Sequence, residues 1–283
     1  MTQTLSVFQS LWAMQDLPWR ATTPWTLEES IQRAASAGFA GVAIDTYSPD
    51  DIPPAARIAP ALRAAGLRVS VTVFVTESRP LTDGLAYAQE VGAELVVVCG
   101  QVFPDEVSDA ARLVRCWLKE AAEAGMPMHL ETHRYTLTND LGFTARLVRE
   151  VPELALALDL SHYVVGNELP DSDDARVDGL IETLLWHGAS VQGRVATREQ
   201  VQVPLEFAQH RPAVERFRRW WSAAFRSWRE RAANDADCVF LCELGPAPYP
   251  ITGPDGLELS DRWREALLLK SWAEELFVAA EQS

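Results

Sequence analysis

Cysteine is scarce in this sequence, and its four cysteines form no CxxC pair: Cys99, Cys116, Cys238 and Cys242. The chain also begins without the basic segment and following apolar segment that make up a secretory signal. A disulfide framework of a small secreted protein is therefore not expected. These two absences predict a reducing, cytoplasmic setting.

Positive charge is also in short supply, with 25 Lys and Arg against 40 Asp and Glu and a net charge of −15 at pH 7. A surface that follows the phosphates of a nucleic acid needs an excess of Lys and Arg, so no nucleic-acid partner is expected. No apolar run reaches the roughly 18 residues of a membrane span, so no membrane partner is expected either. The acidity itself favours solubility and identifies no partner.

Glycine-rich nucleotide motifs are missing as well, because no GxGxxG follows the first predicted strand and no P-loop occurs. Their absence weakens the alternative of an open, nucleotide-binding α/β sheet. What the chain does have is 283 residues of which 48% are hydrophobic. This length suits a single domain, residues 1–283, with one large buried core.

Strand and helix patterns alternate along the whole chain. Strands are expected at residues 5–12, 41–45, 67–75, 94–99, 126–131, 154–159, 187–195 and 238–243. Helices are expected at residues 26–37, 50–65, 81–91, 105–124, 139–151, 177–185, 211–233 and 260–280, the first with Thr26 and Glu29 as a capping box. Eight such units at this length predict a single (β/α)8 TIM barrel.

Carboxylates end three of the predicted strands: Glu131, Asp159 and Glu243. The active site of such a barrel lies at the carboxyl ends of its strands, so these acids should converge. They would repel each other and their pKa values would rise unless a divalent cation neutralised them. Oxygen ligands suit Mn²⁺, Mg²⁺ or Co²⁺, which predicts one such cation.

The segments around these acids carry a resemblance to a known family. The chain resembles the xylose isomerase-like TIM-barrel superfamily, which includes sugar epimerases, inosose dehydratases and endonuclease IV, and within it the sugar phosphate isomerase/epimerase-like branch. The resemblance spans nearly the whole chain and is sharpest in Glu131-Thr132-His133-Arg134, Leu137-Thr138-Asn139-Asp140, Asp159-Leu160-Ser161-His162, Glu243-Leu244-Gly245-Pro246 and Pro248-Tyr249. It implies that Glu131, Asp159 and Glu243 hold one divalent metal and that His162 meets substrate hydroxyls.

The seventh predicted strand departs from the family pattern His-x-His-Ala-Arg-Val, because this chain reads Ser190-Val191-Gln192-Gly193-Arg194-Val195. Both histidines are replaced, including the expected fourth metal ligand. Either Gln192 or a water completes the site, or the metal has been lost. Gln is a weaker oxygen ligand, so Zn²⁺ should be less favoured. A ligand role for His187 would need a shifted register or a bulge.

Further residues are expected to bind the substrate at the mouth of the barrel. His133 and Arg134 stand just beyond Glu131, and Arg134 and Arg194 could clamp a carboxylate or phosphate or instead pair with neighbouring acids. Trp12, expected at the end of the first strand, and Tyr249, after the eighth, could cover the carbon surface of a ligand.

These residues together predict a metal-dependent isomerase or epimerase of a sugar or related polyhydroxy-carbonyl compound. The cation would favour loss of a C–H proton to give an enediolate, with Glu131 or Glu243 as general base and His162 or His133 on a substrate hydroxyl. A lyase or dehydratase on the same site, and a sugar-binding or partner protein that has lost the strand-seven metal histidine, remain alternatives. Phosphodiester cleavage is disfavoured, because the chain has only five histidines and no basic face. A homo-oligomer is compatible with the sequence.

Overall fold

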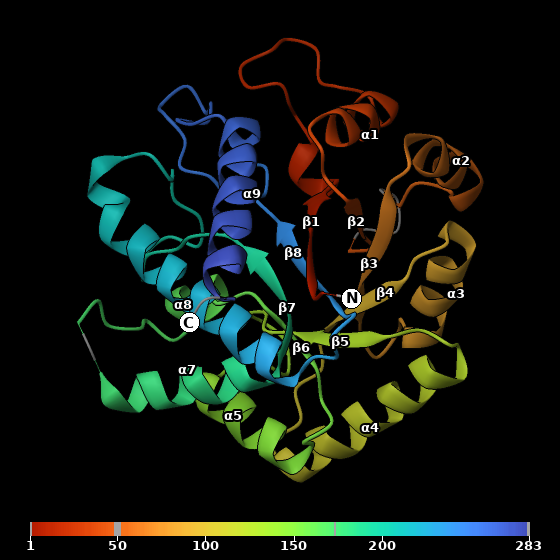
Figure 1. Cartoon of the computed structure of the whole chain (residues 1–283), viewed down its shortest axis with the longest axis vertical. Coiled ribbons are helices and arrows are strands. Elements are labelled where there is room, and N and C mark those ends of the chain that lie inside the picture. The colour runs from red at the N-terminus through yellow and green to blue at the C-terminus, as the bar shows by residue number, and fades with distance from the viewer. Residues whose placement is uncertain (1, 48–51, 173, 282–283) are drawn as a thin grey trace.

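Eight parallel strands close into a barrel in chain order, within the residues that the computed structural model describes, 2–47, 52–172 and 174–281. Each strand pairs with the next, and β8 pairs with β1 (Figure 1). The strands are β1 (Thr4–Ser10), β2 (Gly41–Asp45), β3 (Arg68–Val75), β4 (Leu95–Gly100), β5 (Met128–Glu131), β6 (Leu156–Leu158), β7 (Gly188–Gly193) and β8 (Asp237–Cys242). The predicted (β/α)8 barrel is confirmed.

Helices follow the strands and form the outer layer of the molecule (Figure 1). They are α1 (Leu27–Ser36), α2 (Ala55–Ala65), α3 (Leu81–Val91), α4 (Val107–Glu123), α5 (Leu141–Glu150), α6 (Ser161–Gly166), α7 (Ala175–His187), α8 (Arg211–Arg231) and α9 (Arg262–Ala279), with the 3-10 turns η1 (Trp12–Met14) and η3 (Ala208–His210). In the described part of the chain, no helix is long and apolar enough to cross a membrane.

The ends of the elements follow the local sequence, with a few differences from prediction. The capping box of α1 is present, since Thr26 Oγ1 accepts a hydrogen bond from the Glu29 N–H at 3.2 Å and a Glu29 oxygen accepts one from the Thr26 N–H at 2.8 Å. The helix predicted from residue 50 begins only at Ala55, because the two prolines before it disfavour helical backbone at the residues preceding them. Residues 50 and 51 lie outside the described residues. Strand β1 ends at Ser10, so the placement of Trp12 in that strand was wrong.

The interior of the barrel is filled by side chains that alternate with outward-facing ones along each strand. Phe8, Ala43 and Leu241 form one interior cluster. The interior also contains a polar pair, since a ring nitrogen of His129 lies 2.9 Å from Ser190 Oγ. His129 thus packs one layer below Glu131, as predicted. Because the interior below is packed, the inward-facing residues at the carboxyl ends of the strands are the ones that face the mouth of the barrel.

A buried carboxylate ties the connection between β7 and α8 to the start of α9. Glu265 is 3% exposed, and its two oxygens accept hydrogen bonds from the Leu205 N–H at 2.8 Å and from Ser260 Oγ at 3.1 Å. Burial raises the pKa of Glu265 to about 7 from its ordinary 4.5. The folded state therefore binds this proton more tightly than the unfolded state does. As the pH rises from 4.5 to about 7, ionisation of Glu265 lowers the free energy of unfolding.

We expect Glu265→Gln to remove this part of the pH dependence. Relative to the natural protein, the free energy of unfolding of the variant should rise by up to about 3 kcal/mol between the two pKa values, and the gain should persist at higher pH. Urea unfolding across this pH range measures the difference. A difference that does not change with pH would contradict the prediction.

Candidate active site

Three carboxylates come together at the carboxyl ends of the strands. Glu131 is the last residue of β5, and Asp159 and Glu243 directly follow β6 and β8. All three side chains are buried, and one oxygen of each lies within 4.8 Å of the others. Each acid stands two residues after an interior side chain, so the alternation of its strand aims it inward. The convergence expected from the sequence is present, and the role of these acids as metal ligands stays a prediction.

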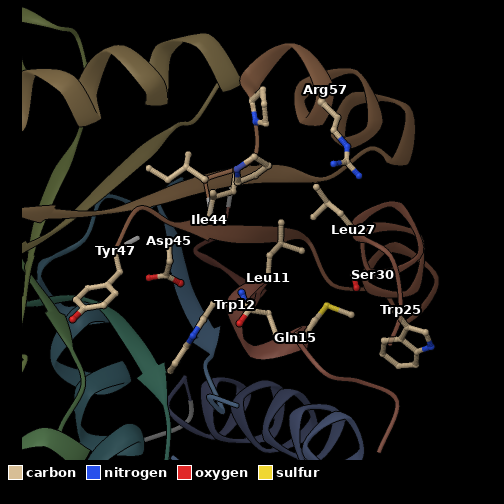
Figure 2. Close-up of a pocket in the computed structure, with 14 residues that line it drawn as sticks. Leu11, Trp12, Gln15, Trp25, Leu27, Ser30, Ile44, Asp45, Tyr47 and Arg57 are labelled. Carbon is tan, nitrogen blue, oxygen red and sulfur yellow. The ribbon is translucent and has the colours of Figure 1, made fainter. Parts of the chain in front are cut away.

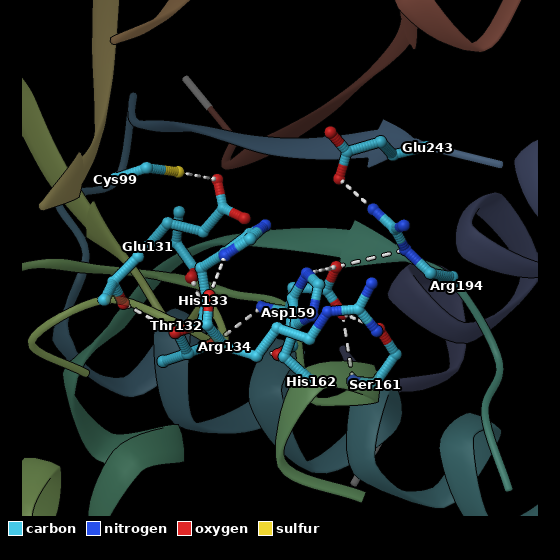
Figure 3. A network of polar contacts seen from close by, with 12 residues as sticks. Cys99, Glu131, Thr132, His133, Arg134, Asp159, Ser161, His162, Arg194 and Glu243 are labelled. Carbon is cyan, nitrogen blue, oxygen red and sulfur yellow. Dashed lines mark hydrogen bonds and ion pairs between the residues drawn. The ribbon is translucent and has the colours of Figure 1, made fainter. Parts of the chain in front are cut away.

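Hydrogen bonds from neighbouring residues hold the carboxylates of Glu131 and Asp159 in place (Figure 3). The Cys99 thiol donates to Glu131 Oε2 at 3.1 Å, and burial keeps the pKa of that thiol well above its ordinary value. The Ser161 N–H and hydroxyl both donate to Asp159 Oδ1, at 2.9 and 2.5 Å. Helix α6, which the sequence analysis missed, begins at Ser161 and so orients Asp159.

The guanidinium group of Arg194 lies between Asp159 and Glu243 (Figure 3). Its Nη2 donates to Glu243 Oε2 at 2.7 Å, and its Nε lies 3.2 Å from Asp159 Oδ2. Arg194 is 2% exposed, and the guanidinium also sits 4.9 Å from the centre of the Tyr249 ring. Of the two roles left open for Arg194, pairing with neighbouring acids is the one that the structure contains.

Negative charge still exceeds positive charge in this cluster. Asp45, the last residue of β2, adds a fourth carboxylate, and burial raises its pKa to about 6. Burial and the nearby Asp159 raise the pKa of Glu131 to about 7. Burial also raises the pKa of Glu243 well above its ordinary value, although Arg194 acts in the opposite direction. The cluster therefore favours the binding of additional positive charge, either as protons or as a cation.

Two neutral imidazoles flank Glu131. The rings of His133 and His162 are 3.9 Å apart between centroids, and burial lowers the pKa of His133 to about 4 and lowers that of His162 well below its ordinary value. His133 Nδ1 donates to the Arg134 carbonyl at 2.5 Å, which assigns the lone pair to Nε2. Neither ring nitrogen of His162 has a hydrogen-bond partner among the described residues, although its Nε2 lies 3.4 Å from Asp159 Oδ2. One nitrogen of each ring lies within 4.8 Å of a Glu131 oxygen, so this trio forms a second group that could hold a cation or a hydroxyl.

Strand β7 presents Gln192 where the family resemblance expects a histidine. Gln192 is 2% exposed. Burial raises the pKa of Glu131, and a hydrogen bond with the amide group of Gln192 acts against that rise. The amide oxygen of Gln192 has no hydrogen-bond partner in the part of the chain that the structure describes. His187 is the last residue of α7, and its Nδ1 donates to the Leu154 carbonyl at 3.2 Å. It lies at the opposite end of β7 from Gln192. The pairing of β6 with β7 is irregular, but it does not bring His187 to the site, so that alternative is wrong.

A pocket of about 350 Å³ opens over the cluster. Its lining contains seven of the residues predicted for the site: Trp12, Glu131, His133, Arg134, Arg194, Glu243 and Tyr249. The rings of Trp12 and Tyr249 meet edge to face at 5.0 Å. Asp159, Gln192 and His162 are buried and do not belong to this lining. The pocket is large enough for a small organic molecule.

A second pocket of about 420 Å³ adjoins the first and shares Trp12, Asp45 and Tyr47 with it. Figure 2 shows these three side chains at one side of the second pocket and Trp25 with Leu27 across from them. The second pocket contains none of the three clustered acids. It provides mainly apolar space beside the mouth of the barrel.

Two residues of the cluster, Asp45 and Cys99, were not predicted from the sequence. Asp45 ends a strand just as Glu131 does, and this position was the available signal. Cys99 belongs to an apolar strand, and nothing in the sequence marks it as the donor to Glu131.

No family model matches the chain, and no curated protein matches it. Solved structures match it over nearly its whole length. A xylose isomerase-like TIM barrel/4-hydroxyphenylpyruvate dioxygenase fusion protein is 15% identical with a TM-score of 0.60, over 99% of this chain but only 44% of that protein. A D-tagatose 3-epimerase-like protein is 12% identical with a TM-score of 0.60, over 96% of this chain and 98% of that one.

A xylose isomerase-like TIM-barrel protein from Mycobacterium smegmatis, in complex with magnesium, is 14% identical with a TM-score of 0.56, over 96% of this chain and 98% of that one. Other matches include proteins described as a probable dehydratase, a sugar phosphate isomerase/epimerase and an AP endonuclease. At these identities the likeness concerns the fold. The chain has the fold of the xylose isomerase-like TIM-barrel proteins.

Proposed function

We propose that the protein is a metal-dependent isomerase or epimerase of a sugar or related polyhydroxy-carbonyl compound. The observation that carries this proposal is the cluster of Glu131, Asp159 and Glu243, with one oxygen of each within 4.8 Å of the others beneath a pocket of about 350 Å³. Similar folds occur in proteins described as epimerase-like and as sugar phosphate isomerase/epimerase.

The residues present fit a hard divalent cation. Three carboxylates supply oxygen donors and a surplus of negative charge, and Gln192 offers a buried amide oxygen that has no hydrogen-bond partner among the described residues. We assign the ligand positions to these four side chains. An all-oxygen set favours Mn²⁺, Mg²⁺ or Co²⁺ over Zn²⁺. The bound cation would polarise a substrate carbonyl and stabilise the negative charge of an enediolate.

Glu131 or Glu243 would act as the general base that removes the substrate proton. Both line the pocket, and burial raises the pKa of each, which makes a carboxylate a better proton acceptor near neutral pH. Before the cation binds, Arg194 would hold Glu243 and Asp159 in place through its two ion pairs.

The other predicted residues would bind and orient the substrate. His133 and His162 are uncharged, and Nδ1 of His162 has no hydrogen-bond partner in the described structure, so they suit a hydrogen bond to a hydroxyl or a proton relay. The faces of Trp12 and Tyr249 would cover carbon surface and exclude water from the reacting atoms.

Hydrogen exchange provides the test of this function. We expect the Mn²⁺-loaded protein to exchange one carbon-bound hydrogen of a ketose or aldose substrate with D₂O without loss of water, and a chelator to stop the exchange. A panel of such sugars followed by NMR gives the measurement. Loss of water with a conjugated product would instead indicate a dehydratase, and exchange that continues after complete chelation would contradict the proposal.

A non-catalytic sugar-binding or partner protein is the second candidate. It is favoured by Gln192 in place of the expected histidine and by Arg194, which already pairs with two of the three acids. In that case purified protein should contain no divalent metal, and Mn²⁺ should not raise its melting temperature.

A further inference from the structure

Arg134 is a cation in the pocket that has no acidic partner. It is half-buried in the lining, and no carboxylate forms an ion pair with it among the residues that the structure describes. Arg194, in the same lining, pairs with Asp159 and Glu243. In a chain with a net charge of −15, an arginine that stays unpaired beside an acidic cluster is available for an external anion.

The backbone that carries Arg134 is held rigidly. Its carbonyl accepts a hydrogen bond from His133 Nδ1, and the next residue, Tyr135, has a left-handed φ of 56°. A side chain other than glycine rarely adopts this conformation, and here Asn139 supports it by accepting a hydrogen bond from the Tyr135 N–H at 2.9 Å. The turn therefore holds the backbone at Arg134 in one conformation, so less backbone freedom is lost when the side chain binds a ligand.

Tyr249 lies beside both arginines of the pocket. The guanidinium of Arg134 lies 5.2 Å from the centre of the Tyr249 ring, and that of Arg194 lies 4.9 Å from the same ring. The two arginines therefore flank Tyr249. Because the charge of Arg194 is already paired with two carboxylates, Arg134 is the arginine of this pocket whose charge can be matched by a new anion.

We propose that Arg134 binds an anionic group of the substrate, a carboxylate or a phosphate, and thereby selects anionic over neutral sugars. The other end of such a substrate would carry the hydroxy-carbonyl group placed at the acid cluster, a part that rests on the proposed function. The planar fork of Arg134 matches two oxygens of either anion. Arg134 is thus a specificity-determining residue, and the preferred substrate is a sugar acid or a sugar phosphate.

Three small probes that share a diol separate the anion from the rest of the substrate: glycerol, D-glycerate and glycerol 3-phosphate. Calorimetric titration of the intact protein, with and without Mn²⁺, should give tighter binding of at least one anion than of glycerol. Arg134→Gln should weaken the binding of that anion by about 10- to 100-fold and leave the binding of glycerol unchanged. Arg134→Lys, which keeps the charge but loses the fork, should lie in between.

Arg63→Gln is the matched control, because Arg63 is an exposed arginine in the last turn of α2, at the end of the barrel away from the pocket. It makes the same change in net charge and should leave all three probes unaffected. Circular dichroism confirms that each variant is folded.

The proposal is wrong if neither anion binds more tightly than glycerol, or if Arg134→Gln, shown to be folded, binds the anions as the natural protein does. Mn²⁺ binding is measured separately in the same titrations. An anion preference that depends on Arg134 in a protein that binds no Mn²⁺ would support this inference and refute the metal-dependent function. Mn²⁺ binding without any anion preference would refute this inference and support the metal-dependent function. Whichever anion binds more tightly identifies the carboxylate or the phosphate as the natural group.

Discussion

Replacement of Glu131 by glutamine is expected to weaken Mn²⁺ binding by about 100-fold or more, because loss of outer-shell partners alone typically costs about 10- to 100-fold and Glu131 is a proposed direct ligand. The substitution keeps the size of the side chain and keeps an oxygen that can accept the hydrogen bond from the Cys99 thiol. It removes one of the negative charges that make the cluster attractive to a cation. Turnover of any sugar substrate should fall with the affinity.

The same substitution should stabilise the metal-free protein. Burial and the nearby Asp159 raise the pKa of Glu131 from 4.5 to about 7, so ionisation of this group opposes folding as the pH rises through that interval. Glutamine carries no such charge. In the presence of chelator the free energy of unfolding of Glu131→Gln should exceed that of the natural protein by up to about 3 kcal/mol above pH 7, with no gain at the acid end of the interval.

Glu265→Gln is the matched control, because Glu265 is also buried with a pKa raised to about 7 but lies outside the cluster. It should reproduce the stability change in chelator and leave Mn²⁺ affinity unchanged. Calorimetric titration with Mn²⁺ and urea unfolding over a range of pH distinguish the two variants. Unaltered Mn²⁺ binding by folded Glu131→Gln would exclude Glu131 as a ligand.

Strand periodicity was enough to predict most of the barrel and the convergence of three acids. Helix α3 occupies the predicted residues, because Pro80 before it and the left-handed Gly92 after it leave little freedom in its ends. Alternation also placed Glu131 above His129 on the inner face of β5. These features depend on local sequence and on the even period of a strand, which a single sequence reveals.

Long-range geometry could not be predicted in the same way. Alternation put Arg194 on the inner face with Gln192, but only the closed barrel shows that its guanidinium reaches the acids that follow β6 and β8. His187 was uncertain because the boundary between α7 and β7 depends on packing: a side chain at Gly188 would strike Leu158, so the strand begins at a glycine. Asp45 is different, because it ends β2 as Glu131 ends β5 and its place near the cluster could have been predicted from that position.

Arg194→Gln is expected to be the most destabilising substitution in the site when no divalent cation is available. Removal of Arg194 leaves two buried acids, Asp159 and Glu243, without their shared counter-charge, and loss of one partner of a buried ion pair typically costs about 3 to 5 kcal/mol. The loss should be smaller at acid pH, where the carboxyls take up protons instead. Urea unfolding in chelator measures the effect.

Mn²⁺ should reverse much of this loss if the proposed metal site is real. Without Arg194 the cation no longer competes with a guanidinium for Asp159 and Glu243, so Mn²⁺ should bind the variant more tightly and raise its melting temperature more than that of the natural protein. Arg262→Gln provides the control: Arg262 is 1% exposed and pairs with Glu258 at 2.8 Å, and although it also donates to the Leu244 carbonyl, it forms no ion pair with the three acids in the described structure. It should destabilise the protein without any rescue by Mn²⁺.

The outcome for Arg194→Gln separates the two functions that the acid cluster allows. Rescue by Mn²⁺ would mean that guanidinium and cation satisfy the same charge deficit, as expected of a metal-dependent enzyme in which Arg194 holds the acids until the cation binds. Destabilisation that Mn²⁺ does not relieve, at concentrations that saturate other carboxylate sites, would mean that Arg194 has replaced the metal. The barrel would then be a metal-free binding protein, and Gln192 would mark a ligand position that no longer holds an ion.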